Sequence, residues 1–274
     1  MRSLARQRGF TLVELVMVIV ILGIVGAMVA VFMRAPIDAY FDTARRAALT
    51  DVADTALRRM ARDIRKALPN SVRNPNANCI EFIPTRTGGR YRTEDAVPGD
   101  GTALEFGPPP DSRFNMLGRN SDLSADQQIE PGDQVVVYNL GIPGADAYGR
   151  DNSETVRTVV DGVETSITLT NPKNFPLSSP GHRFHVVPAG ETIVSYVCSG
   201  GRLYRQSGYN YNNSCPAPTP GTTPVIANDV AACNFVYSGS DLQRNALVQM
   251  TLRLTDAANE SVTLYHAVHV DNTP

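Results

Sequence analysis

The sequence predicts an α+β fold, in which one long N-terminal helix precedes a C-terminal, mainly antiparallel β-sheet. Up to residue 68, apolar residues recur at three- to five-residue steps and glycine and proline are few, as expected for a helix. From residue 79, short apolar runs alternate with Gly, Pro, Asn and Asp turns, as expected for strands. No crossover helix is evident after residue 70, so we expect the strands to pair antiparallel.

Composition and charge exclude a disordered chain and disfavour a nucleic-acid-binding protein. Of the 274 residues, 42% are apolar and 19% are charged, so a packed core can form and wholesale disorder is excluded. Residues 1–66 carry eleven Lys/Arg and six Asp/Glu, whereas the rest of the chain carries fourteen and twenty-one. The formal net charge of −2 favours no polyanionic partner, and we expect no binding to nucleic acid.

Residues 10–33 are expected to span a membrane as a helix. Their only ionisable side chain is Glu14, and a helix of this length covers about 36 Å, more than the roughly 30 Å of a bilayer core. The segment is longer than the apolar part of a secretory signal, and no A-x-A cleavage site follows it. Residues 1–9 carry three arginines, so the positive-inside rule keeps them in the cytoplasm and sends residues 34–274 across the membrane.

Glu14 is unusual, because a carboxylate within a membrane helix is costly and marks a functional site unless it reaches the interface. It ends the run Gly9-Phe10-Thr11-Leu12-Val13-Glu14, which joins the basic leader to the apolar segment. This run resembles the type III signal of type IV prepilins, G-F-T-L-x-E. The resemblance implies cleavage after Gly9 by a membrane prepilin peptidase, N-methylation of Phe10, and a role for Glu14 in assembly.

Electrostatics is consistent with that role of Glu14. Cleavage would create an α-amino cation on Phe10 that becomes buried when helices pack into a filament, and breaking a buried ion pair costs about 3–5 kcal/mol. Glu14 follows Phe10 by four residues, which places both on one helical face, one turn apart. We therefore expect the carboxylate to meet its own amino group or that of a neighbouring subunit. Gly23 and Gly26 would allow close helix approach.

Residues 34–69 are expected to continue the helix as an amphipathic stalk that ends at Pro69 and Asn70. The predicted apolar stripe consists of Phe41, Ala44, Ala48, Val52, Leu57, Met60, Ile64 and Leu68. A cationic cluster near the end consists of Arg58, Arg59, Arg62, Arg65 and Lys66. These cations could contact DNA phosphates. A solvated helix face with the i,i+4 ion pairs Asp54–Arg58 and Arg59–Asp63 is the favoured interpretation.

Residues 70–274 are expected to form a β-rich head. The predicted strands are 79–83, 103–107, 134–140, 155–160, 165–170, 183–187, 192–198, 202–206, 232–237, 246–255 and 261–270. Residues 107–111 and 215–224 are rich in proline and are expected to be extended surface loops.

A long N-terminal helix followed by an antiparallel head is similar to the pilin arrangement. Several segments also resemble MshO-type minor pilins of the mannose-sensitive haemagglutinin (MSHA) pilus, which are themselves similar to the J-type minor pseudopilins of type II secretion. These segments are residues 41–73, 79–92, 193–209 and 227–237.

The four cysteines are expected to form disulfides, because the head is predicted to lie outside the cytoplasm. They are Cys79, Cys198, Cys215 and Cys233, and they allow three pairings. The favoured pairing joins Cys198 to Cys215 and Cys79 to Cys233, and free buried thiols are the alternative.

No constellation in the sequence indicates catalysis, a cofactor or a metal site, so we do not expect an enzyme. The motifs G-x-S-x-G, H-E-x-x-H, G-x-G-x-x-G and the P-loop are absent from the sequence. The pairs His182/His185 and His266/His269 have HxxH spacing, but on a strand such side chains point to opposite faces, which disfavours zinc. A calcium loop at residues 146–154 is conceivable.

The favoured function is that of a minor pilin of the MshO type. The resemblance implies a bacterial inner-membrane protein with one span and a periplasmic head, which is processed by prepilin peptidase and incorporated at or near the tip of an extracellular type IV pilus. Its implied partners are the peptidase, other major and minor pilins, and the inner-membrane assembly platform. Retention of Glu14 implies a position beneath another subunit.

Two alternative functions stay open. One is a J-type minor pseudopilin of a type II secretion system. The other is an adhesive tip module, in which the aromatic and amide-rich residues 204–213 bind a sugar.

Overall fold

The computed structural model describes residues 9–209, 211, 214–239 and 245–274. It divides the chain into two compact units, residues 1–48 and 49–274. Helix α1 (Leu12–Arg65) extends through the end of the first unit and into the second, and all further elements belong to the second unit. The expected long N-terminal helix is confirmed, although it ends three residues before Leu68.

The N-terminal unit is an exposed apolar helix. From Leu12 to Met33 every described residue is exposed, and the most apolar 18-residue window of α1 has a mean hydropathy of 3.1. By length and composition this helix can cross a membrane, as the sequence predicts. The helix continues through Pro36 without interruption.

The second unit buries one face of the last turns of α1. Its buried helical residues are Leu49, Ala53, Ala56, Leu57, Met60, Ala61 and Ile64. The predicted stripe was wrong at Phe41, Ala44, Ala48 and Val52, which are exposed. The buried face includes three alanines that the stripe omitted, because small side chains let the helix backbone lie close to a sheet.

Within the described residues the strands form three sheets, and every strand pairing is antiparallel, which confirms the α+β prediction. The five-stranded sheet consists of β1 (Arg73–Asn76), β2 (Cys79–Phe82), β9 (Val194–Ser199), β10 (Arg202–Ser207) and β11 (Val225–Ala227), in that order. The three-stranded sheet consists of β12 (Val230–Ser238), β13 (Asn245–Thr255) and β14 (Ser261–Asp271). The six-stranded sheet has the order β3 (Thr87–Arg90), β8 (Arg183–Val187), β5 (Gln134–Val137), β6 (Ser153–Val160), β7 (Thr165–Lys173) and β4 (Asp111–Met116). Short 3₁₀ helices cover Asn120–Asp122 and Ala189–Glu191.

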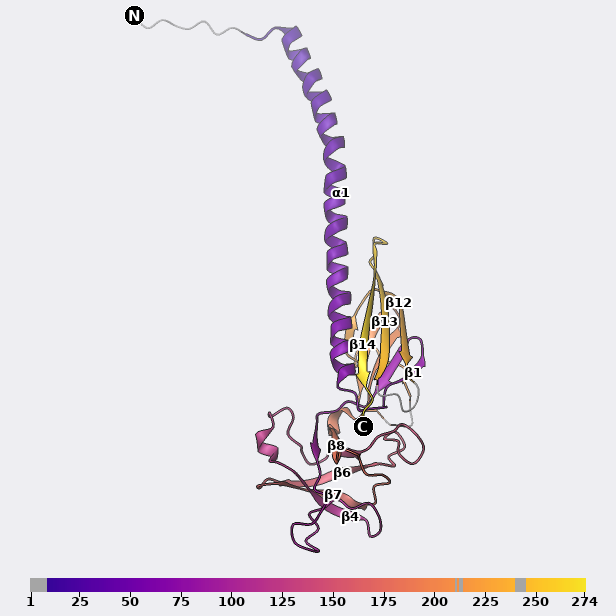
Figure 1. Cartoon of the computed structure of the whole chain (residues 1–274). Coiled ribbons are helices and arrows are strands. Elements are labelled where there is room, and N and C mark those ends of the chain that lie inside the picture. Colours follow the sequence, from indigo (N-terminus) through magenta and orange to yellow (C-terminus); the bar gives the residue numbers. More distant parts are fainter. Residues whose placement is uncertain (1–8, 210, 212–213, 240–244) are drawn as a thin grey trace, which may run out of the picture. The chain divides into compact units, whose positions relative to one another are not determined.

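The six-stranded sheet is an insertion into the five-stranded one. Strands β2 and β9 are neighbours, with Phe82 opposite Val194, and the chain between them builds the whole six-stranded sheet. We call residues 83–193 the inserted lobe and the rest of the second unit the helix lobe. Figure 1 shows β12–β14 beside the last turns of α1 and the strands of the inserted lobe grouped separately.

Each lobe has its own core. In the helix lobe, α1 packs against apolar residues of both the five-stranded and the three-stranded sheet, among them Phe82, Tyr196, Phe235 and Met250. The core of the inserted lobe includes Phe114, Phe175 and Phe184. A smaller buried cluster lies at the junction of the two lobes and consists of Leu68, Ile83, Val136, Ala147 and Val187.

Most predicted strands are present, but the strand predicted at residues 103–107 was wrong. Ala103 and Leu104 are buried there without being part of a strand. Four short strands, β1, β3, β4 and β11, were not predicted. Strand β3 contains two glycines, which disfavour a strand in sequence, yet a Cβ on Gly89 would lie 2.7 Å from Met116 Sδ and 2.9 Å from the Phe184 ring. The strand therefore requires glycine for packing.

Candidate processing and assembly site

Gly9 and Phe10 lie ahead of α1, in a segment without helix or strand structure. Both are exposed, Phe10 to 82%, and a Cβ on Gly9 would meet no atom within 4 Å. No described part of the chain therefore covers the peptide bond between them. Such an uncovered, non-helical bond is the form in which a peptidase can reach its substrate.

Thr11 fixes the start of the helix. The backbone N–H of Glu14 donates a hydrogen bond to Thr11 Oγ1 at 3.3 Å, which is the N-cap interaction. Thr11 and Glu14 have the T-x-x-E spacing of a capping box, and Glu14 lies in the first turn, where the helix dipole favours a carboxylate. This role of Thr11 was missed in the sequence analysis, although the capping-box spacing could have revealed it.

In the uncleaved chain Phe10 lies ahead of the helix, which differs from the position expected for it once residues 1–9 are removed. The helix begins at Leu12, so Phe10 is not on a helical face one turn from Glu14. The cap at Thr11 causes this difference, because an N-cap residue has non-helical backbone angles and turns the preceding chain away from the helix.

The apolar helix surface after Glu14 is open. Gly23 and Gly26 lie three residues apart, and a Cβ on either would meet no atom within 4 Å. This surface is available to lipid or to neighbouring helices.

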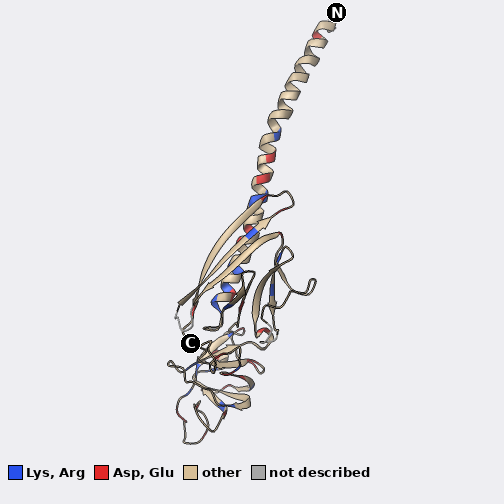
Figure 2. Cartoon of the chain, turned by 90° about the vertical axis from the view of Figure 1, so that its right-hand side faces the viewer, with Lys and Arg blue, Asp and Glu red and all other residues tan. Residues whose placement is uncertain are grey.

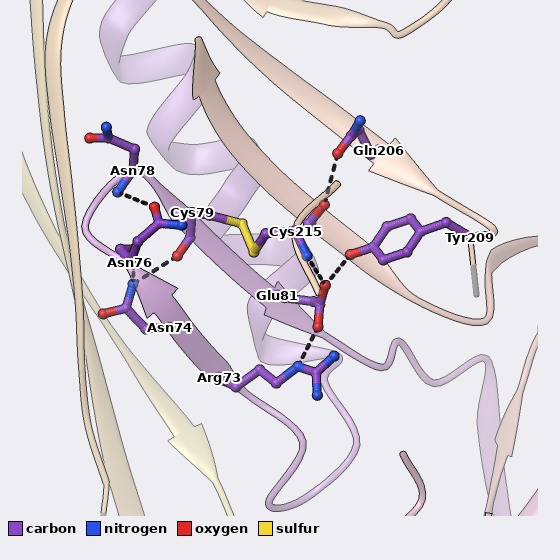
Figure 3. Close-up of a disulfide and its surroundings, with 10 residues drawn as sticks. Arg73, Asn74, Asn76, Asn78, Cys79, Glu81, Gln206, Tyr209 and Cys215 are labelled. Carbon is purple, nitrogen blue, oxygen red and sulfur yellow. Dashed lines mark hydrogen bonds and ion pairs between the residues drawn. A yellow bond between two sulfur atoms is a disulfide. The ribbon is translucent and has the colours of Figure 1, made fainter. Parts of the chain in front are cut away.

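The disulfides differ from the expected pairing. Cys79 is bonded to Cys215, and Cys198 is bonded to Cys233. The expectation assumed that the chain after β10 stays beside its own hairpin. Instead this chain returns to β2, where the N–H of Cys215 donates a hydrogen bond to the Glu81 carboxylate at 2.8 Å (Figure 3). That contact brings Cys215 to Cys79 and leaves Cys198 to bridge β9 and β12.

Glu81 is the centre of a buried polar cluster. Its side chain is fully buried in β2 and accepts hydrogen bonds from Arg73 and from the hydroxyl of Tyr209 in addition to Cys215 (Figure 3). The Arg73 guanidinium also lies 3.7 Å from the ring centre of Tyr148, a cation–π contact. Burial, followed by the hydrogen bond to Glu81, raises the pKa of the Tyr209 hydroxyl.

These contacts argue against the sugar-binding alternative. Tyr204 is only 4% exposed, Tyr209 donates to Glu81, and the Tyr211 hydroxyl donates to Gln134 Oε1 at 2.9 Å. The aromatic side chains of the stretch therefore hold the loop in place and are not presented to a ligand. Asn210, Asn212 and Asn213, which belong to the same prediction, lie outside the described residues.

At the cationic end of α1, one of the two expected ion pairs is present, and in the other the acidic residue has different partners. Arg58 Nε lies 2.7 Å from Asp54 Oδ2, as expected. Asp63 was expected to pair with Arg59, but it accepts hydrogen bonds from Tyr196 and Arg205 of the five-stranded sheet. The reason is that Asp63 faces the sheet, so its carboxylate meets the side chains of β9 and β10.

The candidate metal ligands lie apart or have other partners. His266 is half-buried and His269 exposed, because they point to opposite faces of β14. Within the proposed calcium loop, Asp146 Oδ1 accepts the Tyr148 N–H at 3.0 Å and Asp151 Oδ2 accepts the Gly144 N–H at 2.9 Å. Among the described residues, no three His, Cys, Asp or Glu side chains are grouped to hold a metal ion.

Comparison with known proteins places the N-terminal segment in a family. Residues 4–30 match the prokaryotic N-terminal methylation motif, and this range includes Gly9, Phe10 and Glu14. No curated protein and no solved structure matches the chain. The matched segment coincides with the exposed bond, the capped helix start and the apolar helix described above. The motif therefore supports a type IV prepilin-like protein, and it implies processing by prepilin peptidase, a membrane-anchoring helix and assembly with other pilins.

Proposed function

We propose that this chain is a minor pilin of the MshO type, incorporated at or near the tip of an MSHA-type pilus. The observation that carries the proposal is the methylation motif at residues 4–30, located at an uncovered peptide bond and a capped helix start. The two-lobed second unit supports a minor rather than a major subunit, because the inserted lobe adds bulk to the helix-plus-sheet core. The prepilin-like motif supports a structural role rather than catalysis.

In this proposal the chain has four parts. Residues 1–9 are a leader that stays in the cytoplasm, residues 10–33 are the membrane and filament-core helix, residues 34–69 are the stalk, and residues 70–274 are the periplasmic head. The pilus assembly platform of the inner membrane would transfer the processed subunit to the extracellular filament.

Glu14 would act after cleavage. Removal of residues 1–9 leaves an α-amino cation on Phe10, and the Glu14 carboxylate supplies the opposite charge in the filament core. Because Thr11 caps the helix between them, we propose that Glu14 pairs with the amino group of a neighbouring subunit. A subunit that retains this carboxylate belongs beneath another subunit.

Intact-mass analysis tests the processing step. We expect the chain from cells with prepilin peptidase to lack residues 1–9 and to carry one additional methyl group, and the chain from peptidase-deficient cells to keep its full mass. Gly9→Val should block cleavage. Gly26→Val makes the same substitution away from the bond that is cleaved, and it should not block cleavage. An unchanged full-length mass in both strains would contradict the proposal.

A J-type minor pseudopilin of type II secretion is the second candidate function. It is a candidate because MshO-type minor pilins, which residues 41–73, 79–92, 193–209 and 227–237 resemble, are themselves similar to J-type pseudopilins, although these segments favour the pilus. Deletion of the gene separates the two functions. Loss of surface pili with normal secretion supports the pilin, and loss of secreted enzymes with normal pili supports the pseudopilin.

A further inference from the structure

An open groove lies between the end of α1 and strand β14. The helix contributes Asp54, Arg58, Ala61, Arg62 and Arg65, and β14 contributes His266. The groove has a volume of about 450 Å³, which is within the range of ligand clefts. All of these residues belong to the second unit.

The groove carries uncompensated positive charge. Asp54 is paired with Arg58, and no further carboxylate lines the groove among the residues that the structure describes. Arg62 and Arg65 are exposed and have no ion-pair partner within the part of the chain that the structure describes. Figure 2 shows these last turns of α1 carrying several Lys and Arg residues.

The wall opposite the arginines is the edge of a sheet. β14 pairs with β13 over its whole length, from Ser261 to Asp271, and no described strand pairs with its other side. Natural proteins usually protect such an edge with proline, lysine or a bulge. β14 contains no proline, lysine, arginine or glutamate, and its register is regular throughout. Its unpaired N–H and C=O groups are therefore open to a further strand.

We propose that this groove docks an extended, acidic segment of a neighbouring pilin subunit. The segment pairs with the edge of β14 as an added strand and places a carboxylate against Arg62 and Arg65. This mode combines main-chain hydrogen bonds with charge complementarity, as in other cases of strand addition. The proposal rests on the proposed function, since it identifies the surface through which this pilin contacts another.

The unpaired edge of β14 distinguishes among the possible occupants of the groove. A nucleic acid could neutralise Arg62 and Arg65, but it has no peptide main chain to pair with β14. A second copy of this chain, paired edge to edge through the same groove, would bring the two sets of arginines together. A different pilin subunit with an acidic strand can place carboxylates against the arginines and can also hydrogen-bond its main chain to β14.

Site-specific photo-cross-linking in piliated cells tests the proposal. The probe is p-benzoylphenylalanine at Tyr265, which is 61% exposed on β14, in the full-length chain. We expect an adduct with a second protein that carries a prepilin motif, with the cross-link in an Asp- or Glu-containing peptide. Arg62→Glu/Arg65→Glu should lower the adduct yield at least fivefold.

Arg59→Glu/Lys66→Glu is the matched control, because it makes the same charge change on the same helix outside the groove. It should leave the yield unchanged. Equal yields in the groove variant and the wild type, an equal loss in the control, or an adduct with DNA or lipid would overturn the proposal. Intact mass and pilus content are measured on the same cells. A processed, incorporated chain without the adduct refutes only the groove, whereas an unprocessed chain refutes the proposed function.

Discussion

Arg205 and Asp63, which are 142 residues apart in the sequence, form an ion pair that joins β10 to the last turns of α1, with Nε and Oδ2 2.9 Å apart. Asp63 also accepts a hydrogen bond from Tyr196 at 2.7 Å, and Arg205 binds Glu191 through Nη1 and Nη2 at 2.7 and 3.0 Å. The hydrogen bond to Glu191, followed by that to Asp63, raises the pKa of Arg205. This network fixes the end of the helix to the five-stranded sheet.

Arg205→Met should destabilise the second unit by about 2–3 kcal/mol, because two carboxylates lose a partly buried, hydrogen-bonded cation. Arg58→Met provides the comparison, since Arg58 is 67% exposed and solvent screens its pair with Asp54, so its loss should destabilise the unit much less. Urea unfolding of the full chain in detergent, followed by tyrosine fluorescence, measures both. Equal effects of the two substitutions would contradict the structural role of Arg205.

The disulfides should be recovered as Cys79–Cys215 and Cys198–Cys233 when the non-reduced chain is digested and its peptides are identified by mass. The bridges link residues 136 and 35 positions apart, and loop-closure entropy predicts a stabilisation of about 4–5 kcal/mol for each. Cys79→Ser/Cys215→Ser should therefore lower the urea midpoint markedly. Recovery of a Cys198–Cys215 peptide would instead support the pairing expected from the sequence.

Much of the architecture could be predicted from sequence because it depends on local periodicity. The helix, the antiparallel strands and the N-terminal methylation motif are all encoded by residues close together in the chain. The sheet topology, by contrast, depends on contacts between residues that are far apart in the sequence. Nothing near Phe82 indicates that its strand partner is Val194, on the far side of an inserted lobe.

The same limit explains the errors at the polar sites. Asp63 was assigned to Arg59 by i,i+4 spacing, but its contacts come from Tyr196 and Arg205, which only the tertiary fold brings near. The disulfide pairing likewise depends on Glu81 holding the chain at Cys215 beside β2. Thr11 is the opposite case, because its cap is local and the T-x-x-E spacing contains the signal.

His185 should make the stability of the second unit depend on pH. It lies in β8 with Nε2 buried and unpartnered, and burial, followed by the nearby charge of Arg183, lowers its pKa from 6.5 to about 4. The folded state therefore favours the neutral imidazole. Its contribution is complete above pH 6.5 and is lost as the pH falls from 6.5 to about 4, by roughly 3 kcal/mol in total.

His185→Gln removes this titration, so the variant should lose less stability than the wild type between pH 6.5 and 4. His269→Gln is the control, because it makes the same substitution at an exposed position of β14. Unfolding midpoints of the wild type and both variants, measured between pH 6.5 and 4, test this prediction. Parallel profiles for the wild type and His185→Gln would show that His185 does not set the pH dependence.

Glu14→Gln should separate processing from assembly. The cap at Thr11 uses the backbone N–H of residue 14, so the helix start is preserved and cleavage after Gly9 should continue. In the filament core the amino group of Phe10 would lack its counter-charge, and a cost of about 3–5 kcal/mol predicts a loss of incorporation of more than tenfold.

Immunoblots of sheared pili and of membranes measure that loss, and intact mass confirms that the variant was processed. Thr11→Ala is the complementary change, because it removes the cap, worth about 1 kcal/mol, and keeps the carboxylate. It should therefore reduce incorporation much less than Glu14→Gln does. If Thr11→Ala were the more severe of the two, the helix start rather than the charge of Glu14 would be what assembly requires.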